Sequence, residues 1–266
     1  AEDTLPQAVR DCMRGKKAPR AALLLARPAR LLGWAAGHTI LLDDLYDALG
    51  SLDACSYVRQ HASGQILFID AAQAEGEDAL RMLRGIRFAG QLQFDIEKQT
   101  LAAIREKAPT LVNVSAERIR TELTKLLVSD GADRLLLAHE TGLSAYFLPE
   151  FDRMLATEQN NPHHMYDVGH HTIEAVRHIN RIFKEHEEFD EKAHVWLVYA
   201  ALLHDVAKPD CKTTDASGID HFHNHNALGA EKARGILRRL KFDNETVSVV
   251  TRIIENHDNR HENCMI

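Results

Sequence analysis

Histidine is concentrated in the second half of this sequence, and this concentration constrains the fold and its use more than any other feature. Of the 16 histidines in the 266 residues, 13 lie between His163 and His261. A chain of this length buries a core without a disulfide or a metal as reinforcement. Chance placement on a water-exposed surface would rarely give such a density, so we expect the C-terminal half to use imidazole side chains.

The overall composition is that of an ordinary globular protein, with 45% hydrophobic and 27% charged residues. The longest apolar runs, such as Ala21–Ala26, are far shorter than the roughly 20 residues that cross a bilayer, and the first residues do not resemble a secretion signal. Because no cysteine pair has C-x-x-C spacing, we expect a reducing compartment, the cytoplasm, and no zinc ribbon. The cysteines are Cys12, Cys55, Cys211 and Cys264.

The net charge of the chain limits how it could bind nucleic acid. The chain carries a formal net charge of −7. The molecule as a whole therefore does not attract RNA, and any RNA contact has to come from a local basic patch.

The sequence divides into three regions by pattern. Residues 1–74 are irregular and contain one strand-like run, Gln65–Asp70. From residue 75 the pattern is helical; Ser115 is placed to cap one helix and Gly142 to end another. Pro162 predicts a boundary after residue 160, since the residue before a proline avoids helical geometry. Strand signal is nearly absent after residue 75, so we expect only helices there, including Val168–Phe183, Ala193–Ala207, Asn226–Leu240 and Asn244–His257.

Histidines and aspartates stand at the ends of these expected helices. His204 and Asp205 follow an apolar helix that must itself be buried, and a buried Asp is costly unless it is paired or bound to a cation. Imidazoles and carboxylates from several helices suit a transition-metal hydrolytic centre with open positions. The other members of this set are His171, His221, His223, His225, His257 and Asp258.

A single histidine is more often a surface or hydrogen-bonded residue than a metal ligand. The coincidence of several at helix ends and in short connections nevertheless favours a metal site. The remaining histidines of this half lie on polar helix faces, and we expect them to be solvated: His163, His164, His178, His186 and His194.

The order His, His-Asp, His, His resembles the HD superfamily of metal-dependent phosphohydrolases, which hold one or two divalent ions. The surrounding residues Tyr166–Thr172, Ala201–Pro209, His221–His225 and Gly229–Glu231 resemble, more specifically, the HD domain of bacterial tRNA nucleotidyltransferases and poly(A) polymerases. One departure is Ala207, where the family usually has Gly. The resemblance implies the metal ligands His171 (rather than His170), His204, Asp205, His225, His257 and Asp258, with Asp205 and Lys208 in catalysis and Lys208 facing a substrate phosphate.

The resemblance extends upstream to the neck of the same enzymes. Glu77–Ala89 is similar to a neck segment in which an Asp and an Arg read the base of the incoming CTP or ATP, here Asp78 and Arg81. A carboxylate accepts from a base amino group and a guanidinium donates to ring acceptors, and residues three apart share a helix face. A surface ion pair is the plainer alternative. The same region holds a basic strip, or merely a solvated face, which as a strip would bind RNA phosphates. It consists of Arg81, Arg84, Arg87, Arg118, Arg120 and Lys125, of which Arg84, Arg87, Arg118 and Arg120 are the candidate RNA-binding residues.

The first region departs from the family. Val9–Gly15 resembles the phosphate-binding turn of the nucleotidyltransferase head, which makes Arg10 and Asp11 candidate nucleotide-binding residues. The paired aspartates that hold two Mg²⁺ ions in the family fall on Arg20 and Ala22. Either this head is degenerate, or the sequence lacks segments of a complete one.

The resemblance therefore implies a mainly α chain. Its parts are a short or incomplete α/β nucleotidyltransferase-like head at 1–74, a helical neck at 75–160 and an all-α HD domain at 161–266. The implied activity is transfer of nucleotides from CTP or ATP to an RNA 3′ end, as CCA addition to tRNA or as polyadenylation, with Mg²⁺. Beside it stands phosphohydrolysis with Ni²⁺, Co²⁺ or Mn²⁺. The alternatives are the HD phosphohydrolase acting alone and an RNA-binding scaffold with both sites inactive; no membrane partner is expected.

Overall fold

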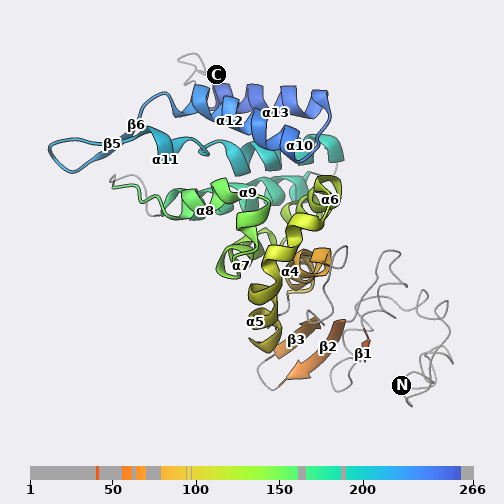
Figure 1. Ribbon diagram of the computed structural model, residues 1–266. Helices are drawn as coiled ribbons and strands as arrows, with labels where there is room; N and C mark the ends of the chain where they lie inside the picture. Colours follow the sequence, from red (N-terminus) through yellow and green to blue (C-terminus); the bar gives the residue numbers. More distant parts are fainter. Residues whose placement is uncertain are drawn as a thin grey trace.

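In a computed structural model the chain forms a body of helices with a small sheet at one end (Figure 1). The structure describes residues 79–258, apart from 94, 97, 161–165 and 187–189, and the backbone of strands β1 (Ile40–Leu41), β2 (Ser56–His61) and β3 (Gly64–Ile69). Several residues singled out from the sequence lie outside the described ranges: Arg10, Asp11, Asp78, His163 and His164.

The sheet has the strand order β1-β2-β3-β4, with β4 at Asp95–Ile96. Strand β2 pairs antiparallel with β1 and β3, and β3 pairs parallel with β4. The predicted strand at Gln65–Asp70 is confirmed as β3, one residue earlier. Strand β2 was not predicted, because Ser56–His61 holds only two adjacent apolar residues among polar ones.

The neck region, here residues 79–160, consists of short helices. Ser115 is the N-cap residue of α6, as predicted, although its side chain makes no capping hydrogen bond. Gly142 follows the end of α7 with φ at 73°, a left-handed conformation that favours glycine. The helices are α4 (Leu80–Leu92), α5 (Lys98–Lys107), α6 (Ala116–Leu127), α7 (Leu135–Glu140) and α8 (Pro149–Leu155), with the 3-10 turns η5 (Ala108–Asn113), η6 (Ala132–Arg134) and η7 (Ser144–Tyr146).

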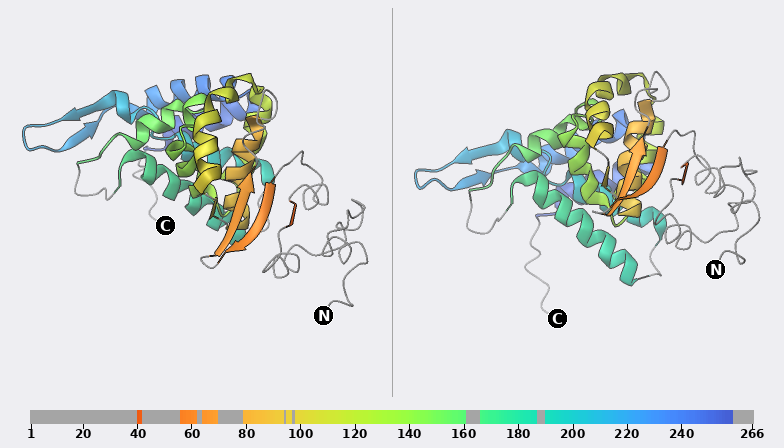
Figure 2. Two further views of the ribbon diagram at one scale, coloured as in Figure 1. Left: turned by 60° about the horizontal axis from the view of Figure 1, so that its bottom comes forward. Right: turned by 90° about the horizontal axis from the view of Figure 1, so that it is seen from below.

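The HD region, here residues 161–258, contains the four predicted helices and a hairpin that was not predicted. The helices are α9 (Val168–Glu185), α10 (Glu191–Leu203), α12 (His225–Arg239) and α13 (Asn244–Asn256), with the short α11 at Lys208–Cys211. Helix α10 ends four residues earlier than predicted, and the chain turns before α11 starts. Strands β5 (Lys212–Thr214) and β6 (Asp220–Phe222) form the hairpin, which projects from the helices (Figure 2). Strand β5 is polar and exposed throughout, so it carries no apolar alternation that would predict a strand.

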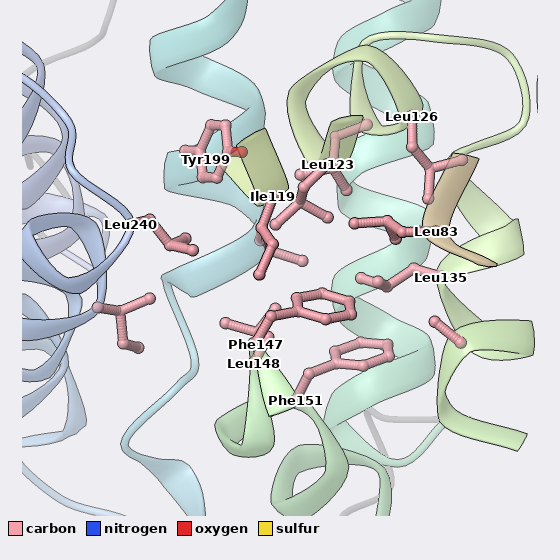
Figure 3. Close-up of a cluster of buried hydrophobic side chains, with 14 of the residues drawn as sticks. Leu83, Ile119, Leu123, Leu126, Leu135, Phe147, Leu148, Phe151, Tyr199 and Leu240 are labelled. Atoms are coloured by element: carbon pink, nitrogen blue, oxygen red, sulfur yellow. The ribbon is translucent and has the colours of Figure 1, made fainter. Parts of the chain in front are cut away.

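The two regions share one hydrophobic core (Figure 3). Leu83, Ile119 and Leu123 of the neck pack in the same cluster as Tyr199 and Leu240 of the HD region. Full burial of a side chain of this size contributes about 1.5–3 kcal/mol. The Tyr199 hydroxyl lies 2.9 Å from that of Thr124, and burial raises the pKa of Tyr199. Among the described residues, no helix is both long and apolar enough to cross a membrane.

Asn180 on α9 joins the two regions by hydrogen bonds. Its amide nitrogen donates to the carbonyls of Leu127, at 2.8 Å, and Ser129, at 2.9 Å, and its side-chain oxygen accepts from His194 Nε2 at 2.8 Å. The His194 ring also stacks on Phe183, with 4.3 Å between centroids, and burial lowers its pKa. The prediction that His194 is solvated is therefore wrong, whereas His178 and His186 are exposed as predicted.

Candidate metal centre

Asp205 is at the centre of a cluster of imidazoles. Helix α10 is apolar and ends in buried Leu202 and Leu203, so the chain that follows it is drawn into the core. Asp205 is only 1% exposed, and its two carboxylate oxygens point to two different groups of side chains. A carboxylate buried so deeply requires positive charge around it.

The first group lies on the Oδ2 side. His204 Nε2 is 3.1 Å and His171 Nε2 is 3.8 Å from Asp205 Oδ2. His171 comes from the first turn of α9, and His204 immediately follows α10. The neighbouring His170 is not part of the group, since its Nδ1 lies 2.6 Å from Asp167 at the start of α9.

The second group lies on the Oδ1 side. His225 Nε2 and His257 Nε2 are 3.4 Å and 3.9 Å from Asp205 Oδ1 and 3.2 Å from each other. His225 begins α12, and His257 ends α13. Asp258, which is 60% exposed, brings an oxygen to within 3.4 Å of His225 Nε2. In each group, ligand atoms from three residues lie within 4.8 Å of one another, and Asp205 belongs to both.

The same kind of hydrogen bond orients three of these imidazole rings. The Nδ1 atoms of His204, His225 and His257 lie 2.8, 2.7 and 2.5 Å from the carbonyl oxygen three residues earlier. Each Nδ1 therefore carries a proton and donates it, and each Nε2 faces Asp205. Hydrogen bonds of this kind set the tautomer and orientation of metal-binding histidines. With Nδ1 protonated, the Nε2 atoms of His225 and His257 turn lone pairs toward each other, an arrangement that a shared cation stabilises.

The pKa shifts of the cluster also fit a site for a cation. Burial works against charge on Asp205, but His204 and Lys208 outweigh it and hold the pKa of Asp205 far below its ordinary value. Burial also opposes charge on His204, and contact with Asp205 still raises the pKa of His204. Burial lowers the pKa of His257. His204 and Lys208 are thus the groups that stabilise the charge of Asp205, and a divalent ion bound here would compete with a proton on His204.

Lys208, in the first turn of α11, also contacts Asp205 and lines the same pocket as the imidazoles. Its Nζ lies 2.8 Å from Asp205 Oδ2 and donates to Gln159 Oε1 at 2.9 Å, and the residue is only 6% exposed. Gln159 escaped the sequence reasoning, because a lone glutamine between two helices carries no periodic or motif signal.

The cluster forms the floor of a pocket of about 610 Å³, within the size range of small-molecule sites. His221 and His223 belong to the hairpin side of the wall, and their rings lie parallel with centroids 5.6 Å apart. His221 is held by Asp215, 2.9 Å away across the hairpin. The pocket therefore combines a floor of imidazoles around a buried carboxylate with two parallel imidazole rings in its wall.

Both the neck region and the HD region match known protein families. The family described as "Probable RNA and SrmB-binding site of polymerase A" matches residues 93–155, and the HD domain matches residues 168–264. The CC-adding tRNA nucleotidyltransferase of Thermus thermophilus is 34% identical over 191 residues, which are 69% of this chain and 42% of the relative. The neck and HD regions of this chain belong to the tRNA nucleotidyltransferase and poly(A) polymerase family.

Other members of the family give the same picture. The A-adding tRNA nucleotidyltransferase of Deinococcus radiodurans is 35% identical over 68% of this chain and 41% of its own length. A multifunctional CCA protein of Actinobacillus pleuropneumoniae is 29% identical over 77% of this chain and 53% of its own length. This chain thus spans about half the length of these relatives. A solved tRNA-processing enzyme in its apo form matches 94% of this chain and 72% of its own, at a TM-score of 0.47 and 13% identity, which is too distant to add to the comparison.

Of the arginines expected to form a basic strip in the neck of this family member, Arg87 is buried and Arg84 is paired inside the neck. Arg87 is only 5% exposed, and its Nε donates to Glu122 at 2.7 Å; Arg84 donates to the other oxygen of Glu122 at 3.1 Å. Burial lowers the pKa of Arg87, an effect that Glu122 opposes. The continuous strip is therefore interrupted at Arg87, because the face of α4 that carries it packs on α6. Arg81, Arg118 and Arg120 are partly exposed.

Proposed function

We propose that this chain acts at the 3′ ends of RNA, tRNA above all, with two chemistries on one polypeptide. The family match of the neck and HD regions supports the RNA substrate. The observation that carries the hydrolytic half is the convergence of four imidazoles on the buried Asp205.

The HD pocket is proposed as a metal-dependent phosphohydrolase centre. The donor set fits divalent transition metals such as Ni²⁺, Co²⁺ or Mn²⁺, since imidazole and carboxylate suit these ions and the ring orientations are already set. We assign His171, His204 and Asp205 to one ion and Asp205, His225 and His257 to a second, with Asp258 at its exposed side. Bound divalent ions polarise a phosphoryl oxygen and lower the pKa of a bound water.

The remaining residues of the pocket have supporting roles in this proposal. Lys208 keeps Asp205 ionised and supplies positive charge next to a substrate phosphate. The ring wall of His221 and His223 offers a surface on which a nucleobase or ribose rests. The substrates that suit this pocket are phosphate monoesters and 2′,3′-cyclic phosphates of nucleotides and RNA ends.

Metal-dependent hydrolysis tests the proposal. The full-length protein, stripped of metal, is expected to hydrolyse bis(p-nitrophenyl) phosphate and a 2′,3′-cyclic nucleotide only after Ni²⁺, Co²⁺ or Mn²⁺ is added, and to bind up to two ions by calorimetry. Absence of both binding and hydrolysis with all three metals would refute the phosphohydrolase.

Nucleotidyl transfer is the second chemistry. We assign recognition of the CTP or ATP base to Asp78 and Arg81, phosphate contacts to Arg10 and Asp11, and RNA contacts to Arg118 and Arg120. Arg84, expected from the sequence to contact RNA, instead positions α4 against α6 together with Arg87, through Glu122. Mg²⁺ would accompany the transfer. The test is incorporation of labelled CTP or ATP into a tRNA that lacks its 3′ end.

The two chemistries separate in these assays. Hydrolysis without incorporation would favour the HD centre acting alone, a reading supported by the completeness of its ligand set. RNA binding with neither activity would leave a helical scaffold that binds RNA.

A further inference from the structure

A second hollow of the molecule lies away from the HD centre. A groove of about 610 Å³ forms where α6 meets the first turns of α10 and the connection between α12 and α13. We call it the basic groove, defined by Arg120, Lys125, Lys192, Trp196, Lys241 and Phe242. It combines residues of the neck region with residues of the HD region.

The charge of the basic groove is opposite to that of the whole chain. Four cations line it, with one carboxylate, that of Asp243. Asp243 is turned toward the start of α13, where it accepts from the backbone N–H of Thr246 at 2.9 Å and from its hydroxyl at 2.8 Å. Lys192 is paired with Glu245 at 2.6 Å. A backbone hydrogen bond is the main cause of the lowered pKa of Glu117, and the nearby charges of Lys241 and Arg120 lower it further. The groove keeps an excess of positive charge in a chain with a net charge of −7.

Aromatic rings lie between these cations. The Arg120 guanidinium is 5.2 Å from the centre of the Phe242 ring, and Lys192 Nζ is 5.2 Å from that of Trp196. Trp196 Nε1 donates to the Thr246 hydroxyl at 3.2 Å, so the indole is fixed in orientation, and both rings are partly exposed. Cations that follow a groove, with aromatic rings on which bases stack, are the means by which proteins bind single-stranded nucleic acid.

The groove also has a fixed shape across the two regions. An Arg120 Nη1 donates to the backbone carbonyl of Lys241 and ties α6 to the connection between α12 and α13. The segment that matches the RNA-binding family ends at residue 155 and so covers only Arg120 and Lys125 of the groove. The aromatic half of the groove belongs to the HD domain.

We propose that the RNA-binding surface of this chain continues from the neck onto the HD domain, and that the basic groove holds a single-stranded segment of RNA. The proposal rests on the proposed function for its substrate class. Trp196 lies on α10 and His204 immediately follows it, eight residues further along, which is about 12 Å along the helix axis. RNA held in the groove therefore lies close to the HD centre, so the groove serves RNA substrates and plays no part with small phosphodiesters.

The main experiment measures binding of a fluorescently labelled single-stranded 12-mer RNA by anisotropy at several salt concentrations, with the full chain. The double substitution Lys125→Ala/Lys241→Ala is expected to weaken binding about tenfold at 0.1 M salt and to reduce the slope of log K against log salt by about 1.4, since each single-strand phosphate contact contributes about 0.7. The matched control, Arg177→Ala/Lys184→Ala, removes the same charge from α9 and is expected to bind like the wild type.

A second measurement tests whether bound RNA lies against the indole ring of Trp196. RNA is expected to quench tryptophan fluorescence in the wild type and much less in Trp196→Phe, whose affinity stays within about threefold because phenylalanine still stacks. The double lysine variant should hydrolyse bis(p-nitrophenyl) phosphate like the wild type, but an RNA ending in a 2′,3′-cyclic phosphate about tenfold more slowly at low substrate concentration.

The proposal that the basic groove binds RNA would be overturned by an equal loss of RNA affinity in Lys125→Ala/Lys241→Ala and in the control variant. Unchanged fluorescence quenching in Trp196→Phe would overturn it as well. Competition by polyglutamate as effective as that by RNA would assign the groove to acidic proteins instead. Failure of the proposed function is a separate result, because hydrolysis of the small phosphodiester would then be absent in the wild type itself.

Discussion

The HD centre and the arginine face of α4 show how similar patterns of charge lead to different structures. In the HD centre, the histidines stand in the first turns or just beyond the ends of separate helices, and they converge on Asp205 around an open pocket. On α4, Arg84 and Arg87 stand in the middle of a helix whose face is covered by α6, and they converge on the buried Glu122. Charges at helix ends can meet beside solvent, whereas charges within a packed face must be neutralised inside the protein. The first arrangement is available to a ligand and the second holds helices together.

The largest expected effect tests the functional half of this comparison. Asp205→Asn keeps the size of the side chain but removes the charge that both groups of imidazoles share, so metal-dependent hydrolysis is expected to fall at least about 100-fold. Calorimetry should show loss of ion binding, and His204→Ala should behave similarly. His186→Ala, on an exposed position, should keep wild-type activity. An equal loss in all three variants would mean that stability, and not metal binding, had been measured.

The structural half of the comparison is tested at Glu122. Glu122→Gln leaves two partly or fully buried guanidinium groups without their carboxylate, so the free energy of unfolding should fall by about 3–5 kcal/mol. Urea unfolding measures it. Glu245→Gln breaks an exposed pair with Lys192, and its effect should stay below about 1 kcal/mol. The folded Glu122→Gln variant should still bind metal like the wild type, which would complete the contrast. A fall of less than about 1 kcal/mol in its free energy of unfolding would refute the structural role of Glu122.

Two glycines sharpen the contrast between packed and open helix surfaces. A Cβ at Gly131 would lie 2.2 Å from the Cα of Gly90, where the start of η6 meets α4, so Gly131→Ala should lower the free energy of unfolding by about 1–3 kcal/mol. Gly235, within α12, has open space, and Gly235→Ala should raise stability by up to about 1 kcal/mol through helix propensity. Thermal unfolding of both variants checks the two signs.

The smallest effect concerns His194. Because burial lowers its pKa, the unfolded chain binds a proton at this ring more readily than the folded protein does. The contribution to stability is complete above the unfolded pKa, near 6.5, and is lost as the pH falls through the lower folded value. His194→Gln should therefore show a slightly smaller drop in unfolding temperature between pH 7 and pH 5 than the wild type. The difference is a fraction of a kcal/mol, since the ring is partly exposed; an identical drop would contradict it.

Local pattern predicts the helices of this fold, but long-range pairing decides what their charged faces do. The apolar period of α9, α12 and α13 fixes their limits within about two residues, and the position of His204 after an apolar helix indicates a buried functional pair. Nothing near Arg87 in the sequence reveals Glu122, which lies 35 residues away. His194 likewise stands in the first turn of α10, two residues after Lys192, and meets Phe183 only after α9 and α10 pack. The grouping of the proposed metal ligands of the HD domain comes from resemblance to a family, because spacing alone does not say which helix ends meet.

The hydrogen bonds of Asn180 have a mechanical consequence. Its amide group donates to two carbonyls at and just after the end of α6, and its oxygen accepts from His194 of α10. A rotation of the HD domain against the neck about this point would break the two bonds to Leu127 and Ser129 together and separate the halves of the shared core, whereas the bond to His194 holds Asn180 in place within the HD domain. The two regions are therefore expected to move as one rigid body, so that the basic groove, which is built from both, keeps its shape.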